Sequence, residues 1–465
     1  MKKICTLFLI LVMKFSSAQV IFNNAYSKQD FDYSNAVIER YDGKYLIAGS
    51  SRSQFVTDYD VNVILVDSAG NLIWDKYIGQ SPRMEVAYSI VETIDSNYVL
   101  GGDVIGSIPY LLKIDTAGNM IWEKSYVSPL YSYGSFSIGQ SFEGNFYFLR
   151  NDTSTLFFVT NSSGDSLYSK RYDYVMLKSV VQTRDSGYIM IGDVDTSVIN
   201  DRKICLLKTD SIGDTLWRKT FGGPGYDIAA SVQQLSDDGY IIAGNFDTQI
   251  IDGESETFII RTNSIGDTIW TKHYYLGESN HIKVCKNNNG YILSSKRYMF
   301  GGLPFLDKYF VIITKLDTLG NIEWTRDFDG YSYELGNNVV ETSDGCFLLT
   351  GFVDYGLTFA DAILIKVDSV GNFVLSVPNE FSSKPSKVLS FPNPATDEIN
   401  FVIGESNIQI EELKVFNAFG QKVKTILNIN DHKIKVKLNF LNSGIYFYEL
   451  RLSDNKIEAG KFIVN

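Results

Sequence analysis

The stretch Asp210-Ser211-Ile212-Gly213-Asp214-Thr215-Leu216-Trp217 contains the phrase that decides the fold. An Asp or Asn is followed by two spacers, a glycine, an Asn or Asp, two further residues and a tryptophan. The five tryptophans of the chain all stand at its last position: Trp74, Trp122, Trp217, Trp270 and Trp324. Two degenerate copies, with Tyr168 and Leu375 at that position, bring the total to seven. Its glycines lie about 46 to 54 residues apart, which is a repeat period and not a domain length.

Each repeat carries a second phrase, an apolar run that ends in glycine, such as Tyr188-Ile189-Met190-Ile191-Gly192. A tight polar turn, here Asp185-Ser186-Gly187, precedes it, and a half-alternating run such as Ala230 to Leu235 stands ahead of such turns. Each period therefore predicts four short strands joined by turns, and no window shows the sustained period of a helix. Four-stranded units of this size are typical of propeller blades. We predict an all-β chain with a seven-bladed β-propeller, whose tryptophans pack between neighbouring blades.

The start of the mature chain predicts how the ring closes. Phe22 to Val37 spans the same number of residues as Trp324 to Val339, so Val20-Ile21-Phe22 aligns with the last strand of a blade. We expect this N-terminal strand to complete the seventh blade, whose first three strands come from 337–367. Such closure removes an exposed sheet edge. The rival is Phe373 to Val377, which follows the last glycine of the phrase in the proper frame.

The phrase Asp-x-x-Gly-x-x-x-Trp resembles the blade motif of quinoprotein-type propellers, and this resemblance implies only how the blades are built. Enzymes of that type also need a cofactor floor, metal ligands and usually a vicinal cysteine pair. This chain has no vicinal cysteines, so we predict no cofactor. Asp58-Tyr59-Asp60-Val61-Asn62 resembles the start of a calcium loop but lacks the following Gly and the distal Glu. Calcium is therefore kept only as an alternative at that loop.

The N-terminal segment is typical of a secretory signal peptide. Lys2 and Lys3 precede the apolar stretch Thr6 to Met13, and small residues at 16–18 place the expected cleavage before Gln19. We divide the chain into a signal peptide at 1–18, a propeller at 19–378, a linker at 379–387 and a C-terminal domain at 388–465. Because no other window holds about 18 uninterrupted apolar residues, no transmembrane helix is expected in the mature protein.

The C-terminal domain differs in composition from the repeats. It opens with Phe391-Pro392-Asn393-Pro394, continues with Gly420 inside the run Leu413 to Val423, and then contains Gly444 and Tyr446. In this order, these motifs resemble the type A sorting domain of the type IX secretion system. The resemblance implies the type IX secretion machinery as a partner, export across the outer membrane, and a location at the cell surface or outside the cell. Alternation such as Ile434 to Leu438 separately predicts a small β-sandwich.

Charge and residue usage argue against several functions. The formal net charge is -12, so nucleic acid is not an expected partner. The propeller holds two histidines, His273 and His281, which argues against a histidine-built metal site or a Ser-His-Asp triad. His273 is expected on an outer strand, whereas His281 opens an inner strand from which it could face the channel. The cysteines of the mature chain stand in apolar strands and are expected to be buried: Cys205, Cys285 and Cys346.

Long loops that differ from blade to blade are expected on one face of the ring, and function is expected there. Their aromatic rings can stack on sugars, and their carboxylates can accept hydroxyl hydrogen bonds. The candidate ligand-binding residues are Tyr59, Asp103, Asp152, Asp193, Tyr226, Phe246, Tyr298, Tyr331 and Tyr355. The three aspartates directly follow second strands, where they either ring the channel mouth or cap local turns.

Two functions remain open. The first is a noncatalytic surface module that binds a glycan or a protein for adhesion or capture, with no catalytic residue. The second is a surface hydrolase or lyase that acts on polysaccharide through propeller carboxylates. That alternative requires two carboxylates about 5 to 10 Å apart across the channel mouth. The rings could equally form a protein-binding patch or simply cover blade edges, and we favour the binding module.

Overall fold

The computed structural model describes residues 21–26, 31–52, 59–79, 83–104, 108–126, 137–151, 154–196, 201–246, 256–286, 289–299, 308–328, 333–354, 360–373, 388–391, 395–403, 409–417, 422–439, 441–453 and 457–464. The expected signal peptide lies outside these ranges. Within them the regular elements are the strands β1 to β35, and no helix is long and apolar enough to cross a membrane.

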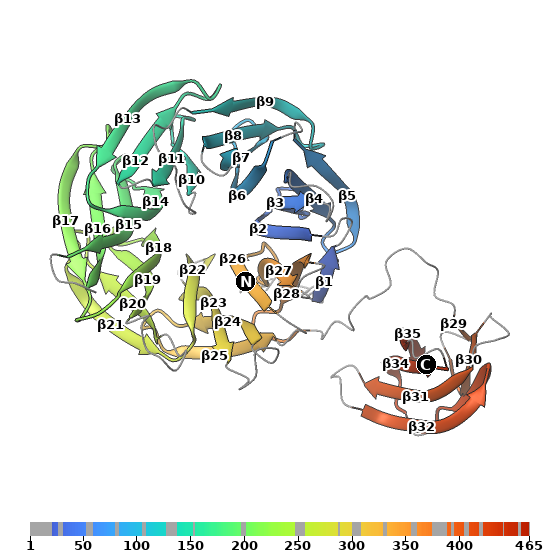
Figure 1. Ribbon diagram of the computed structural model, residues 1–465. Coiled ribbons are helices and arrows are strands. Elements are labelled where there is room, and N and C mark those ends of the chain that lie inside the picture. Colours follow the sequence, from blue (N-terminus) through green and yellow to red (C-terminus); the bar gives the residue numbers. More distant parts are fainter. Residues whose placement is uncertain are drawn as a thin grey trace, which may run out of the picture.

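Strands β1 to β28 form a ring of four-stranded sheets, or blades, and β29 to β35 form a separate smaller body (Figure 1). Blades 1 to 3 are β2 (Phe31–Glu39), β3 (Tyr45–Arg52), β4 (Asp60–Val66), β5 (Leu72–Ile78); β6 (Glu85–Glu92), β7 (Tyr98–Val104), β8 (Ile108–Ile114), β9 (Met120–Ser125); and β10 (Ile138–Gln140), β11 (Phe146–Asn151), β12 (Thr155–Thr160), β13 (Ser166–Tyr172).

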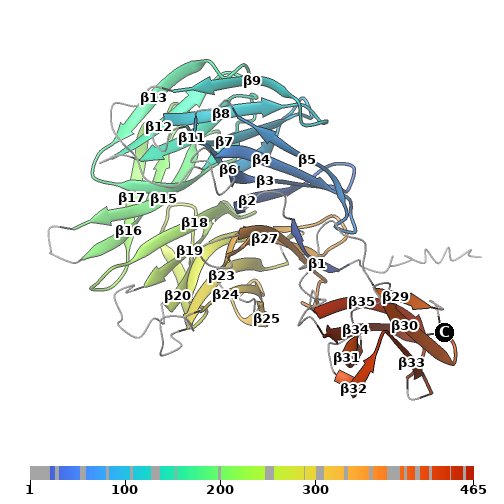
Figure 2. The same ribbon diagram turned by 45° about the vertical axis from the view of Figure 1, so that its right-hand side comes forward.

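Blades 4 to 6 are β14 (Met176–Gln182), β15 (Tyr188–Asp195), β16 (Arg202–Thr209), β17 (Thr215–Phe221); β18 (Ile228–Gln234), β19 (Tyr240–Phe246), β20 (Glu256–Thr262), β21 (Thr268–Tyr274); and β22 (Glu278–Val284), β23 (Tyr291–Met299), β24 (Lys308–Leu316), β25 (Ile322–Phe328). Blade 7 combines β26 (Tyr333–Glu341), β27 (Phe347–Asp354) and β28 (Ala360–Val367) with β1 (Phe22–Tyr26). Figure 1 shows the first strand of each blade innermost and the fourth outermost, and Figure 2 shows from a second side that β29 to β35 form a body of their own.

The repeated aspartate phrase forms the turn between the third and fourth strands of a blade. Asp210 Oδ1 accepts the backbone N–H groups of Ile212 and Asp214 at 3.0 and 2.8 Å, which closes the turn between β16 and β17. Gly213 has a φ of 83°, a left-handed conformation that glycine adopts without steric cost. The phrase is therefore first of all a turn, which accounts for its Asp and its Gly.

Each tryptophan packs on the turn glycine of the next blade. A Cβ added to Gly266 would lie 2.8 Å from the ring of Trp217, so the close approach requires glycine a second time. The same contact joins Trp74 to Gly118, Trp122 to Gly164, Trp270 to Gly320 and Trp324 to Gly371. Two residues after Trp217, Lys219 Nζ lies 2.8 Å from Asp267 of the same neighbouring turn. The outer strand of one blade thus contacts the next blade through an aromatic side chain and a cation.

The N-terminal strand closes the ring, as the sequence favoured. Strand β1 pairs antiparallel with β28, and Phe22 stands opposite Lys366 just as Trp324 stands opposite Lys315. The Phe22 ring packs on Gly70 of blade 1, where the other blades place tryptophan. The strand runs from Phe22 to Tyr26, further along the chain than the predicted 20–22.

The rival closing segment takes a different course. Phe373 belongs to no strand, and its ring packs edge-on against Phe328 with the ring centroids 4.7 Å apart. The rest of that segment, 374–377, lies outside the described residues. The edge of β28 is instead covered by β1, whose Asn24 and Tyr26 side chains both donate to the carbonyl of Gly70 at 2.8 Å.

A buried cation in the third strand fixes the turn between the first and second strands. Lys208 is 4% exposed, and its Nζ lies 2.9 Å from Asp185. Lys113 with Asp95 and Lys366 with Asp344 repeat this pair at 2.7 and 2.6 Å. Burial alone would raise the pKa of Asp185, but hydrogen bonds from Thr183 and Lys208 outweigh it and hold that pKa below its usual value. The buried lysines are therefore part of the scaffold.

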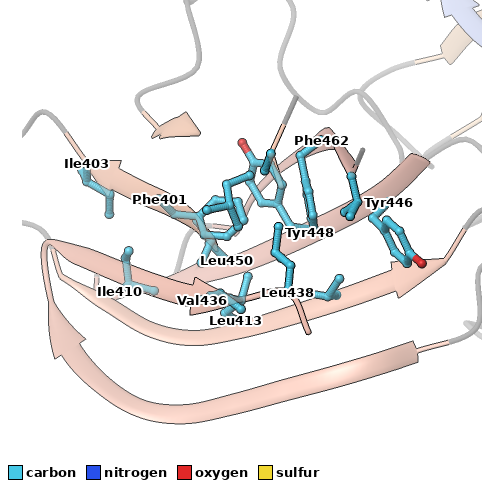
Figure 3. Packing of buried hydrophobic residues seen from close by; sticks show 14 of the residues in the cluster. Phe401, Ile403, Ile410, Leu413, Val436, Leu438, Tyr446, Tyr448, Leu450 and Phe462 are labelled. Carbon is cyan, nitrogen blue, oxygen red and sulfur yellow. The ribbon is translucent and has the colours of Figure 1, made fainter. Parts of the chain in front are cut away.

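The C-terminal body is a two-layer sandwich. One sheet has the order β29 (Val388–Phe391), β30 (Glu398–Ile403), β33 (Lys433–Lys437), and the other the order β32 (Lys422–Asp431), β31 (Ile410–Asn417), β34 (Gly444–Leu452), β35 (Ile457–Val464). Side chains from both sheets form one core, in which Phe401 packs against Tyr448 and Phe462 with ring centroids 4.5 and 5.9 Å apart (Figure 3). The alternation of apolar and polar residues that predicted a sandwich here follows from these two inner faces.

Candidate functional site

The inner strands share an irregularity that shapes the central channel. In β2, β6, β14, β18, β22 and β26 the pairing register shifts at the same place, once per strand. Such a β-bulge leaves one residue unpaired and re-aims its side chain. In three blades the bulged residue is Asn35, Tyr88 or Lys178, and all three line the channel cavity. The bulge therefore brings different polar groups to one level of the ring.

The channel cavity has a volume of about 440 Å³. Six inner strands contribute to its wall, and the remaining blade contributes Ser137, just ahead of β10. Asn245 of β19 also lines it. The polar residues of the wall include Asn35, Tyr88, Ser137, Lys178, His281 and Asn338. A cavity of this size, with one aromatic ring and several hydrogen-bonding groups, matches the usual dimensions of a small-ligand site.

Two predicted aspartates of second strands are compensated by cations. Asp193 is 3% exposed, lies 2.5 Å from Lys178 Nζ and accepts the backbone N–H of Ala229 in the next blade at 2.7 Å. Asp103 is 4% exposed and pairs with Arg150 of the next blade at 2.5 Å. Both predicted aspartates thus lie inside second strands and bind neighbouring groups. Burial raises the pKa of Asp103, and the Arg150 guanidinium opposes that rise.

His281 stands in the channel wall, as its place near the start of an inner strand suggested. Its Nδ1 is buried without a hydrogen-bond partner in the described part of the chain, and so is Oδ1 of Asn338 on the next inner strand. Burial, together with repulsion from Lys283, lowers the pKa of His281 to about 3. A hydrogen bond with the backbone of Val339 opposes this shift but does not outweigh it. The imidazole is therefore neutral at physiological pH and can serve as a hydrogen-bonding group but not as a cation.

The predicted aromatic candidates occupy different environments. Arg52 Cζ lies over the ring of Tyr59, 5.0 Å from the ring centroid, and Arg202 Cζ lies over the ring of Tyr226 at 5.5 Å. Phe246 stacks on Phe258 and His273 with centroids 4.2 and 4.8 Å apart, so it packs within its own blade.

The remaining candidates are less defined. Tyr298 belongs to β23 and pairs with Tyr309. Asp152, Tyr331 and Tyr355 lie outside the described residues, as does the beginning of the calcium-like loop. Among the residues that the structure describes, no group of three or more His, Cys, Asp or Glu could hold a metal ion. Among the candidates that the structure describes, none lines the channel cavity.

Arg150 and Lys178 were not among the predicted site residues. Arg150 stands where blades 1, 2, 4 and 5 have glycine: Gly49, Gly102, Gly192 and Gly244. This replacement of a repeated glycine by a cation is visible in the sequence, and it could have identified Arg150, which forms the buried pair with Asp103. No comparable signal marks Lys178, because the bulge that aims it depends on strand pairing.

The sorting motifs of the C-terminal domain can be placed in part. Phe391 ends β29 and is 49% exposed, and Gly444 begins β34 opposite Val464. Tyr446 is 8% exposed, stacks on Phe462 at 5.7 Å and donates its hydroxyl to the carbonyl of Asn442 at 2.9 Å. Pro392, Asn393, Pro394 and Gly420 lie outside the described residues. Tyr446 thus belongs to the core of the sandwich.

The C-terminal part of the chain matches a known family. Residues 390–465 match the family described as a secretion system C-terminal sorting domain. Among solved structures the chain is similar to the Dos1 propeller, with a TM-score of 0.45 and 10% identity over 74% of this chain and 94% of that one. It is also similar to BamB from Moraxella catarrhalis, with a TM-score of 0.36 and 12% identity over 72% and 86%.

A further similarity is to PorZ, a surface component of the type IX secretion system of Porphyromonas gingivalis. The TM-score is 0.40 and the identity 11%, over 94% of this chain and 59% of that one. No curated protein matches the chain at the sequence level. These likenesses concern the fold alone. The ordered motifs, the sandwich and the family match together identify the C-terminal domain as a type IX secretion system sorting domain, carried behind a β-propeller on a protein exported to the cell surface or the extracellular space.

Proposed function

We propose that this exported protein is a binding module, whose propeller holds a glycan or protein ligand for adhesion or capture. The observation that carries the proposal is the charge compensation around the channel. Asp193 pairs with Lys178 of the wall at 2.5 Å and Glu278 of the wall pairs with Lys296 at 3.0 Å, while the rest of the wall supplies the aromatic ring of Tyr88 and neutral polar groups. Such a site favours recognition over proton transfer, because a paired carboxylate is a poor acid or base.

The alternative is a surface hydrolase or lyase that acts on polysaccharide. Its mechanism needs one carboxyl group that keeps its proton and a second that is free to attack or to activate water. Asp193 accepts from both Lys178 and the Ala229 backbone, and Glu278 is bound by Lys296 at 3.0 Å. These contacts support the binding module, and no described carboxylate pair favours the enzyme.

The test uses the secreted full chain on a glycan array and in pull-downs of surface proteins. We expect saturable binding, with no release of reducing ends from the bound polysaccharides. Tyr88→Ala, which removes the ring from the channel wall, should weaken binding, and Tyr275→Ala is its control because Tyr275 is 75% exposed and absent from the wall. The proposal is wrong if the protein turns over a polysaccharide and loses this activity when one carboxylate is replaced. It is also wrong if no glycan and no surface protein binds the chain saturably.

A further inference from the structure

The turns after the inner strands carry a feature that the fold does not explain. In five blades this turn is tied to the next blade through a backbone N–H group. Ile94 donates to Gln140 Oε1 at 2.8 Å, Phe142 to Gln182 Oε1 at 2.8 Å and Arg184 to Gln234 Oε1 at 3.0 Å. Lys286 and Ser343 make the equivalent bond to Glu341 and Glu39. These residues are therefore equivalent positions in different blades.

The side chains at this position differ sharply in polarity. Blades 4, 5, 6 and 7 have Arg184, Ser236, Lys286 and Ser343, whereas blades 1, 2 and 3 have Tyr41, Ile94 and Phe142. The three apolar side chains are 74%, 70% and 64% exposed. Since the tie is made by the backbone, the turn accepts either kind of residue. Because blades 4 to 7 have polar residues at the same turn position, the fold does not require an apolar side chain there.

The three side chains, which we call the turn patch, occupy successive blades. A Cβ added to Gly144, in the turn that carries Phe142, would lie 3.6 Å from Cδ1 of Ile94. On the other side, Arg40 next to Tyr41 donates to the carbonyl of Thr116 in blade 2 at 2.9 Å. Taking about 200 Å² for each large side chain, the turn patch exposes on the order of 400 Å². An apolar patch of that size on one face indicates an interaction surface.

The charges around the turn patch restrict its partner. Asp42 is paired with Lys44 at 2.7 Å and Asp95 with Lys113 at 2.7 Å. The exposed carboxylates of Glu92 and Glu143 form no ion pair in the described part of the chain. An anionic bilayer would be repelled by this rim, and a second copy would set carboxylate against carboxylate. A segment with basic side chains would be attracted.

We propose that the turn patch docks a polypeptide segment in which apolar side chains are flanked by Lys or Arg. The apolar residues of the segment cover Tyr41, Ile94 and Phe142, and its cations face Glu92 and Glu143. The exposed area is about half of what one partner contributes to a standard stable interface. The contact therefore suits a short segment that binds reversibly. This surface is separate from the channel, so the proposal does not depend on a ligand there.

The test measures binding of fluorescent peptides to the full chain. One probe alternates Lys with Val, and a second has the same length with Glu in place of every Lys. We expect saturable binding of the Lys peptide that weakens with added salt, and little binding of the Glu peptide. The variant Tyr41→Ser/Ile94→Ser/Phe142→Ser introduces the residue found in blades 5 and 7, and should weaken binding by about tenfold or more.

Two matched variants separate this outcome from general stickiness. Leu319→Ser removes an aliphatic side chain that is 64% exposed at another turn tip, and it should leave the affinity unchanged. Glu92→Gln/Glu143→Gln should weaken the Lys peptide and reduce the salt dependence. The proposal is overturned by equal binding of both peptides, by an unchanged affinity of the triple serine variant, or by an equal loss in Leu319→Ser. Patch-dependent binding to anionic vesicles, or patch-dependent dimerisation in sedimentation, would overturn it too.

Discussion

Replacing Trp217 with alanine tests directly whether the contact between its indole ring and the next blade stabilises the propeller. The indole ring is half-buried, lies against Gly266 of the next turn, and has its centroid 6.1 Å from that of Tyr240. Alanine removes the ring but keeps the strand, because the backbone pairing of residue 217 with Lys208 is unaffected. The variant therefore isolates the packing between two blades from the hydrogen bonds within one.

The magnitude follows from the area that the ring covers. A tryptophan buries about 150 to 250 Å², and at the half-buried rim the lower figure applies. At about 25 cal/mol per Å² this gives roughly 3 kcal/mol after the retained Cβ is subtracted. Unfolding entropy of about 2.1 cal/mol/K per residue, over roughly 350 propeller residues, converts this loss to a drop of about 4 °C in Tm.

The assay is differential scanning calorimetry of the full chain, with Leu216→Ala as the matched control. Leu216 precedes the tryptophan on the same strand but is 59% exposed. Its removal should cost less than about 0.5 kcal/mol, which is under 1 °C by the same conversion. If both variants shift Tm equally, or if Trp217→Ala shifts it by less than its control, the ring does not hold the blades together.

Three further outcomes are expected. Phe22→Ala should lower Tm and speed proteolysis near the N-terminus, whereas Ala25→Ser on the exposed side of β1 should do neither. Asp344 has its pKa lowered, because hydrogen bonds from Lys366 and Thr342 outweigh its burial. Its stabilising effect is therefore full above about pH 4 and is lost as pH falls through the lowered pKa. Melts of Asp344→Asn should show a loss of about 1 kcal/mol at pH 7 that vanishes near pH 2. Burial raises the pKa of Cys285 to about 12, so thiol reagents should label it only after denaturation.

The sequence predicted those parts of the fold that depend on local turn chemistry. The Asp and Gly of each phrase show where hairpins turn, and the equal spacing from Phe22 and from Trp324 to their next strands predicted the closing strand. Both predictions rest on residue types and on their spacing along the chain.

Other features depend on tertiary contacts between strands, and these were not predicted. Asp103 was a candidate for the channel mouth, but its partner Arg150 comes from the next blade. Phe246 was a candidate ligand-binding ring, but it packs against Phe258 and His273 in its own sheet. The exposure of Tyr41 could not be predicted either, because the side chain of a turn residue can point toward a neighbouring blade or into solvent. Contacts between side chains from different strands set each of these outcomes.

The pairing of β1 with β28 also fixes an order of events during synthesis. The strand made first has no neighbour until the last propeller strand has left the ribosome, so an incomplete chain holds an orphan strand at one end and an open sheet at the other. Contacts between such distant positions form slowly, and unpaired edges invite pairing with other chains in the meantime. A premature stop anywhere before β28 therefore removes the missing blades and also leaves Phe22 without its place. Complete and truncated chains should therefore differ in their resistance to proteases.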